Sequence, residues 1–184
     1  MSLEKRFRPH QFIKFGFIVF VMAAVLALLN WMPTLIQQHR LQRFGSIDEV
    51  RKELHISKIY LPTYIPEGLN LAWPPSEVYA QDTPFAACIM QFSFRGRKET
   101  ELVIQQAAAD APYRLEPAIR IRKRDAGNTI TVKDRKALFV RGVCDREVPC
   151  CQLTWDEGGT IITLTGKIPA REIVRIAASM LPEK

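Results

Sequence analysis

Four cysteines are the most reactive side chains in this sequence: Cys88, Cys144, Cys150 and Cys151. Four thiols allow three alternative pairings into disulfides. Cys144 and Cys150 bracket a loop of five residues, so a local bond from Cys144 to Cys150 or Cys151 is the first expectation. Cys88 is the alternative partner, reaching across a sheet to Cys150 or Cys151. The sequence therefore predicts a structural disulfide and leaves its connectivity open.

Other thiol chemistry is disfavoured by the spacing of these residues. Structural zinc sites use paired C-x-x-C motifs, redox dithiols use C-x-x-C, and covalent haem attachment uses C-x-x-C-H. None of these motifs occurs in the chain. We therefore expect no metal site, no cofactor and no redox-active dithiol.

Acid–base and nucleophilic catalysis are also disfavoured. The histidines His10, His39 and His55 have no serine or cysteine nucleophile motif beside them. Asp156 and Glu157 are adjacent carboxylates, but they stand in a predicted turn, where acidic residues are common for backbone reasons. The sequence predicts no catalytic residues and a protein that is not an enzyme.

A basic set offers a possible binding face. Arg120, Arg122, Lys123 and Arg124 form this set, within which Arg120 and Arg122 alternate with apolar residues. One interpretation is a solvated strand that blocks pairing between sheet edges. The other is a contact with acidic lipid headgroups or an acidic partner. The net charge of +7 is too mild to argue for nucleic acid.

One apolar stretch predicts how the chain is placed relative to a membrane. Residues 15–32 contain no charged side chain, and an extension back to residue 12 is interrupted only by Lys14. A helix of about 20 apolar residues crosses the hydrocarbon layer of a bilayer. We therefore divide the chain into a basic cytoplasmic tail (1–11), a transmembrane helix (12–32), a polar stalk (33–45) and an extracytoplasmic domain (46–184).

The flanks of this stretch predict its orientation. Lys5, Arg6, Arg8 and Lys14 precede the core of the stretch, which by the positive-inside rule leaves the N-terminus in the cytoplasm. The apolar run is longer than that of a cleaved signal peptide, and no small-x-small cleavage site follows it. The prediction is an uncleaved signal-anchor that crosses the inner membrane once.

The remaining chain has the pattern of an α+β domain. Ser46 and Glu49 have capping-box spacing and begin a short helix. Glu67 and Gly68 mark a turn before a strand at 69–73, and a side chain at Gly68 is expected to destabilise the domain. The last helix spans 169–181. Strands are predicted at 78–79, 88–94, 102–106, 119–124 paired with 129–132, 137–140, 152–155 and 160–164. The aromatic set Tyr60, Tyr64, Trp73, Tyr79, Phe85, Phe92 and Phe94 is assigned to the core.

Motifs near both ends of this domain resemble a known family. They are Leu61-Pro62 followed by Pro66-Glu67-Gly68, the pair Trp155 and Gly159, and the helix 169–181. Together they resemble a domain of unknown function found outside the membrane in bacterial anti-sigma-factor-like proteins. That family is similar in outline to periplasmic sigma-E regulators and lipoprotein-carrier folds. The resemblance implies a curved antiparallel sheet with a packed C-terminal helix and no established catalytic residues.

The expected function follows from the span and the resemblance. We expect a membrane-anchored, non-enzymatic binding or regulatory module of the bacterial envelope, whose partners are the lipid bilayer and proteins of the membrane or envelope. About a dozen residues precede the span, too few for the usual interface of ~800 Å² per partner. The alternative is therefore a single-span accessory subunit of a larger membrane protein complex.

Overall fold

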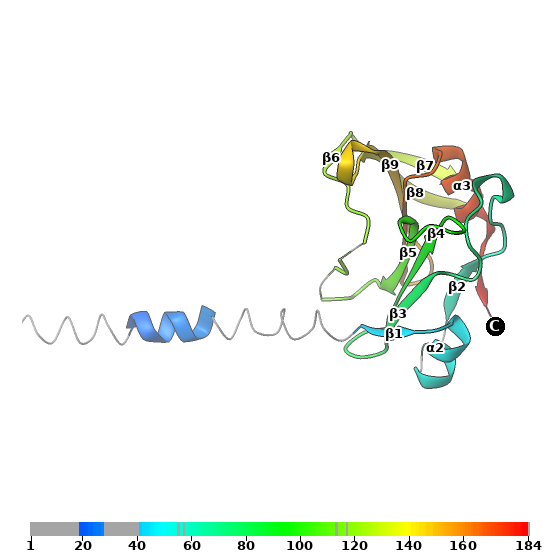
Figure 1. The fold of residues 1–184 in the computed structure, drawn as a ribbon. Coiled ribbons are helices and arrows are strands. Elements are labelled where there is room, and N and C mark those ends of the chain that lie inside the picture. The colour runs from blue at the N-terminus through cyan, green and yellow to red at the C-terminus, as the bar shows by residue number, and fades with distance from the viewer. Residues whose placement is uncertain are drawn as a thin grey trace, which may run out of the picture. The chain divides into compact units, whose positions relative to one another are not determined.

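The computed structural model describes residues 19–27 and 41–183, apart from residues 55, 57, 113 and 117. The chain divides into two compact units, Met1–Arg40 and Leu41–Lys184. In the first unit, residues 19–27 form a helix, drawn in blue in Figure 1. Its large apolar side chains are exposed, and Phe20 is the most exposed of these at 71%.

The predicted membrane span is mostly outside the described residues. Of 12–32, only 19–27 are described, and the tail 1–11 and the residues 33–40 of the predicted stalk are not. No helix within the described ranges is both long and apolar enough to cross a bilayer. The transmembrane helix therefore stays a prediction from the sequence.

The second unit is organised around an antiparallel sheet (Figure 1). The described residues place nine strands in it, eight of them in one continuous path. The path runs β1 (Gln42–Phe44), β3 (Glu77–Gln81), β4 (Ala87–Ser93), β5 (Thr100–Ala108), β10 (Thr160–Gly166), β9 (Pro149–Asp156), β8 (Arg135–Val143) and β6 (Lys123–Arg124), and β7 (Asn128–Val132) also pairs with β8. A second, two-stranded sheet joins β2 (Ile59–Pro62) to β11 (Met180–Glu183).

Two α-helices accompany the sheets, α2 (Ile47–Glu53) and α3 (Ala170–Ser179). Ser46 caps α2, because its Oγ accepts a hydrogen bond from the Glu49 amide at 3.2 Å. The Glu49 carboxylate accepts from the Gly45 amide at 2.5 Å, one residue earlier than in the usual capping box. The predicted helix start is confirmed.

Helix α3 is amphipathic and packs on the sheets. Its buried stripe includes Ile173, Ile176 and Ala177, and it contacts β9, β10, β7 and β2. Two 3-10 helices, η1 (Glu67–Leu69) and η2 (Asp145–Glu147), complete the described elements. A mostly antiparallel sheet with packed helices confirms the predicted α+β class at this level.

The core occupies both faces of the main sheet. On the α3 side it contains the fully buried Met90, Phe92, Leu102, Leu153 and Ile162. On the opposite side a smaller cluster forms where the segment around Ile119 crosses the sheet. Because neighbouring residues of a strand face opposite sides, both clusters draw on the same strands.

Several predicted elements differ from the structure. The strand β1 lies inside the segment assigned to the stalk and pairs with β3, so the compact unit begins before residue 46. The expected strand at 69–73 is largely replaced by η1 and a single bridge from Leu71 to Phe94. Residues 128–132 pair with β8 instead of with 119–124. The strands predicted at 88–94 and 102–106 form the antiparallel pair β4–β5, and those predicted at 152–155 and 160–164 form the pair β9–β10.

Candidate functional site

The disulfide joins Cys144 to Cys150, with 5.9 Å between their Cα atoms. This is one of the two local pairings that the sequence favoured, and its geometry lies in the usual range. The bond closes the short loop that contains η2. Within this loop Asp145 forms an ion pair with Arg122 at 2.7 Å, and Arg146 lies 3.6 Å from Glu99. The loop closed by the disulfide therefore carries charged side chains that pair with two other segments of the domain.

The other two cysteines are free thiols buried on the α3 side of the sheet. Cys88 does not bridge to Cys150 or Cys151, which was the alternative pairing. Cys151 follows Cys150 directly in β9, so its side chain faces the opposite side of the sheet from the disulfide. Desolvation by burial raises the pKa of Cys88 to about 12 and that of Cys151 to about 11. Both therefore remain protonated at neutral pH and are poor nucleophiles.

The basic set is largely neutralised by the chain itself. Arg120 pairs with Glu116 at 2.6 Å and Lys123 lies 3.8 Å from Glu147, in addition to the pair between Arg122 and Asp145. Lys123 and Arg124 form β6, the last strand of the main path. These contacts agree better with a solvated edge strand than with a free cationic face. Exposed pairs of this kind contribute little to stability.

A different group of cations has no such partners. Arg95, Arg97 and Lys98 form the exposed turn between β4 and β5. Within the described part of the chain, no carboxylate forms an ion pair with any of the three. Arg97 lies over the Phe94 ring, with 5.9 Å from its guanidinium carbon to the ring centroid. The turn lies between the strands predicted at 88–94 and 102–106, but the sequence analysis did not single out its charges.

The turn lies beside Trp73, which was assigned to the core. Trp73 is instead 46% exposed, and it stacks on the buried Phe92 with 6.1 Å between ring centroids and 16° between ring planes. A cleft of about 430 Å³ is lined by both Trp73 and Arg95, together with Ile65, Pro66, Glu67, Asn70 and Leu71. The other members of the aromatic set are buried or partly buried. The signal available in the sequence was a tryptophan followed by two prolines, Pro74 and Pro75, which cannot continue a strand.

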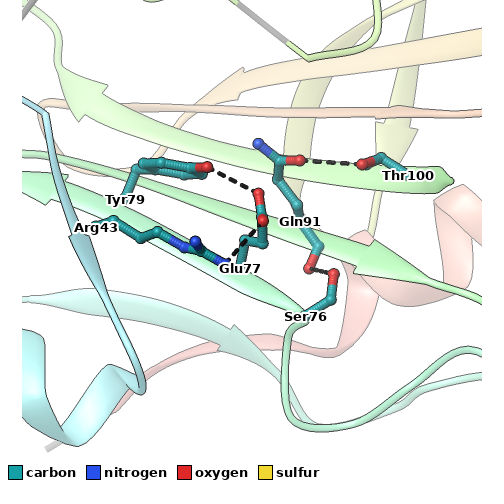
Figure 2. Close-up of polar contacts among 6 residues, drawn as sticks. All are labelled: Arg43, Ser76, Glu77, Tyr79, Gln91 and Thr100. Carbon is teal, nitrogen blue, oxygen red and sulfur yellow. Dashed lines mark hydrogen bonds and ion pairs between the residues drawn. The ribbon is translucent and has the colours of Figure 1, made fainter. Parts of the chain in front are cut away.

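The sheet face opposite α3 has a polar section on β1, β3 and β4 (Figure 2). Glu77 is held from two sides: Arg43 lies 3.0 Å from Oε1, and the Tyr79 hydroxyl donates to Oε2 at 2.8 Å. This hydrogen bond, with burial as the second cause, raises the pKa of Tyr79. The three side chains therefore form a fixed polar group on the sheet surface.

A second polar group continues this face onto β5 (Figure 2). The Thr100 hydroxyl donates to Gln91 Oε1 at 3.0 Å, and the Ser76 hydroxyl donates to the Gln91 carbonyl at 2.9 Å. Gln91 is opposite Glu77 in the register of β3 and β4. Side chains that are already hydrogen-bonded to one another lose less conformational entropy when a partner binds.

The histidines and the adjacent carboxylates Asp156 and Glu157 were the residues considered for acid–base or nucleophilic catalysis. The three histidines lie outside the described residues. Within the described residues, no group of three or more histidine, cysteine, aspartate or glutamate side chains is arranged to hold a metal ion. The adjacent carboxylates separate: Asp156 accepts a hydrogen bond from the Gly159 amide at 2.9 Å, and Glu157 pairs with Arg135 at 2.7 Å.

Comparisons of the chain with protein-family models, with curated proteins and with solved structures found no match.

Proposed function

We propose that this protein is a membrane-anchored, extracytoplasmic binding or regulatory module of the bacterial envelope. The uncharged stretch 15–32 supports the anchor, and the basic residues before it support a cytoplasmic N-terminus. The exposed apolar side chains of the helix at 19–27 need an apolar environment, which a bilayer supplies.

The observation that carries the extracytoplasmic location is the disulfide between Cys144 and Cys150. Disulfides persist in oxidising compartments and are rare in the cytosol, where thiols are kept reduced. The bond closes a loop whose residues pair with Arg122 and Glu99 on other segments, so it is part of the folded structure. A domain built in this way fits a location outside the cytoplasm.

A binding role fits the surface better than catalysis does. The two free thiols have raised pKa values, and the adjacent carboxylates are engaged in a turn and an ion pair. Two features are available to partners instead: the fixed polar groups of Figure 2, and the half-exposed Trp73 beside unpaired cations. Exposed aromatic and arginine side chains are enriched in binding surfaces.

Thiol counting tests the location. Cells that express the full chain are quenched in acid, and thiols of the denatured protein are labelled with a mass tag before and after reduction. We expect two reactive thiols before reduction, Cys88 and Cys151, and four after it. A variant with Cys144→Ser and Cys150→Ser is the control and has two in both cases. Four reactive thiols before reduction would place the domain in a reducing compartment and refute the proposal.

Membrane orientation is tested separately in spheroplasts. Protease added from outside is expected to digest the domain while a cytosolic marker protein stays intact. A domain that is cut only after the membrane is opened with detergent contradicts the proposed orientation, whatever the state of the disulfide.

The second candidate is an accessory subunit of a larger membrane complex. The fixed polar groups around Glu77 and Gln91 favour it, because directional polar contacts suit a defined protein interface. Purification of the full chain in mild detergent separates the two candidates. A stoichiometric set of integral-membrane partners supports the accessory subunit, and recovery of the chain alone supports a free-standing module.

A further inference from the structure

Trp73 is held rigidly at the surface. Its ring stacks on Phe92, which is fully buried, so the base of the indole is fixed by the core while 46% of the residue remains exposed. Pro74, the next residue, is also exposed. The exposed part of this ring adds nothing to the stability of the domain, because only buried apolar area contributes to hydrophobic stabilisation.

The basic turn is fixed beside this ring by backbone hydrogen bonds. The Ala72 amide donates to the Ser93 carbonyl at 2.8 Å, and the Arg95 amide donates to the Asn70 carbonyl at 2.9 Å. A bridge between Leu71 and Phe94 lies between these two bonds. The loop that carries Trp73 and the turn that carries the cations therefore form one rigid surface, and a cleft of about 430 Å³ is lined by Arg95 and Trp73 together.

Among the residues that the structure describes, the cations of this surface are not held in close ion pairs, although Arg97 still acts electrostatically on Glu99 and Glu101. Arg95, Arg97 and Lys98 are exposed, and in the described ranges none of them has a carboxylate partner within ion-pair distance. The nearest acidic residue in sequence, Glu99, is occupied by Lys167 at 2.7 Å and by Arg146 at 3.6 Å. Glu67 is the acidic residue among those that line the cleft.

We propose that Trp73, Arg95, Arg97 and Lys98 form a contact surface for the anionic lipid headgroups of a bilayer. Indole rings favour the membrane–water interface, and each cation near an anionic surface strengthens the partitioning about fivefold. An arginine side chain also pairs bidentately with a phosphate, which places a headgroup phosphate at Arg95 and the indole edge among the upper acyl carbons. This proposal rests on the proposed membrane anchor, since the tether keeps the domain close to lipid.

Lipid quenching tests this contact on the full chain. The protein carries Trp31→Phe, so that the tryptophan of the predicted span is removed, and is reconstituted into nanodiscs. The phospholipids carry bromine on the upper acyl carbons, so that contact with these carbons quenches indole fluorescence. Two compositions are compared, one with roughly 30% anionic headgroups and one with only zwitterionic headgroups. Trp155 is buried and serves as the unquenched reference.

We expect strong quenching with anionic lipid, weak quenching with zwitterionic lipid, and loss of the difference at high salt. Trp73→Phe is expected to abolish the quenching. Replacing Arg95, Arg97 and Lys98 together by glutamine is expected to weaken the partitioning about 100-fold, since each cation contributes about fivefold, and so to remove most of the quenching. The matched control replaces Arg120, Arg122 and Lys123 by glutamine, removes the same formal charge, and is expected to leave the quenching unchanged.

Three results would overturn the proposal. The first is no quenching of Trp73 in anionic nanodiscs, and the second is an equal loss of quenching in the control triple variant. The third comes from a photoreactive residue placed at position 73 in native membranes, if it crosslinks to protein instead of lipid. Thiol counting on the same samples shows whether the disulfide is formed. With the disulfide formed and Trp73 unquenched, the lipid contact alone fails and the extracytoplasmic location stands.

Discussion

The side-chain amide of Gln106 pairs with both backbone groups of Tyr60. The Tyr60 amide donates to Gln106 Oε1 at 2.8 Å, and Gln106 Nε2 donates to the Tyr60 carbonyl at 2.5 Å. Gln106 belongs to β5 of the main sheet and Tyr60 to β2 of the two-stranded sheet, and both are buried. A glutamine side chain thus acts as a short piece of neighbouring strand and joins the two sheets.

Gln106→Leu is predicted to destabilise the domain by about 2–4 kcal/mol, because it leaves two buried backbone groups of Tyr60 without a partner. The measurement is thermal or urea unfolding of the full chain in mild detergent. Gln105→Leu is the matched control on the other face of the same strand. Its buried Nε2 has no hydrogen-bond partner among the described residues, so its replacement is predicted to be neutral or stabilising. Equal losses for the two variants would contradict this role of Gln106.

Glu99 and Glu101 are predicted to affect stability with opposite dependence on pH. The hydrogen bond from Lys167 lowers the pKa of Glu99, so its stabilising contribution is present above its unfolded pKa and is lost as pH falls through the lower folded value. Burial raises the pKa of Glu101, so stability is greatest below the unfolded pKa and falls as pH rises through the higher folded value.

At neutral pH, Glu101→Gln is therefore predicted to raise Tm and Glu99→Gln to lower it slightly. Both differences from the unmodified chain should shrink as the pH falls below the pKa values of the two carboxyls, where both are protonated. Thermal unfolding of the three proteins between neutral and acidic pH checks this. A Glu101→Gln variant that is less stable than the unmodified chain at neutral pH would show that its carboxylate has a partner.

Removal of the disulfide is predicted to cost about 2 kcal/mol, the loop-closure entropy of a short loop. The variant carries Cys144→Ser and Cys150→Ser, and Tm is measured with and without a reducing agent. The unmodified protein should lose stability on reduction, whereas the double variant should not respond. Cys151→Ala is the control, since a free buried thiol has no crosslink to lose. A reduction-sensitive Tm in the double variant would point to a bond elsewhere.

Local signals in the sequence were sufficient for several elements. Ser46 with Glu49 predicted the start of α2 because a cap involves only residues within one turn. The β9–β10 hairpin was predicted because its turn needs positive φ angles, and Gly158 and Gly159 adopt φ of 58° and 87°. The disulfide between Cys144 and Cys150 was also predictable from local sequence, because a short loop brings the two thiols together with little dependence on the rest of the fold.

Contacts between distant segments were not predictable in this way. The strand β1 exists because Arg43 and its neighbours pair with β3, which is more than 30 residues away and leaves no local pattern. The charges of Arg122 and Lys123 gave no indication that η2 would supply carboxylates to them. The exposure of Trp73 depends on Phe92 filling the core beneath it, and its residue type alone favoured burial.

Gly68 and Gly142 differ in the space that a side chain would find. Gly68 was expected to be required by its turn, but it lies in η1, its φ is not in the left-handed region, and a Cβ would contact nothing within 4 Å. Gly68→Val is therefore predicted to change the free energy of unfolding by less than about 0.5 kcal/mol. At Gly142 in β8, a Cβ would collide with the backbone carbonyl of Lys123 in β6.

Gly142→Ala is therefore predicted to cost about 1–3 kcal/mol although it adds only a methyl group, because the clash is with backbone and one of the two strands must move. Equilibrium unfolding of both variants gives the comparison, and hydrogen exchange at the Arg122 amide, which donates to the Val143 carbonyl at 2.8 Å, reports whether β6 has separated from β8. Slow exchange at Arg122 together with full stability in Gly142→Ala would contradict the predicted clash between the new Cβ and the Lys123 carbonyl.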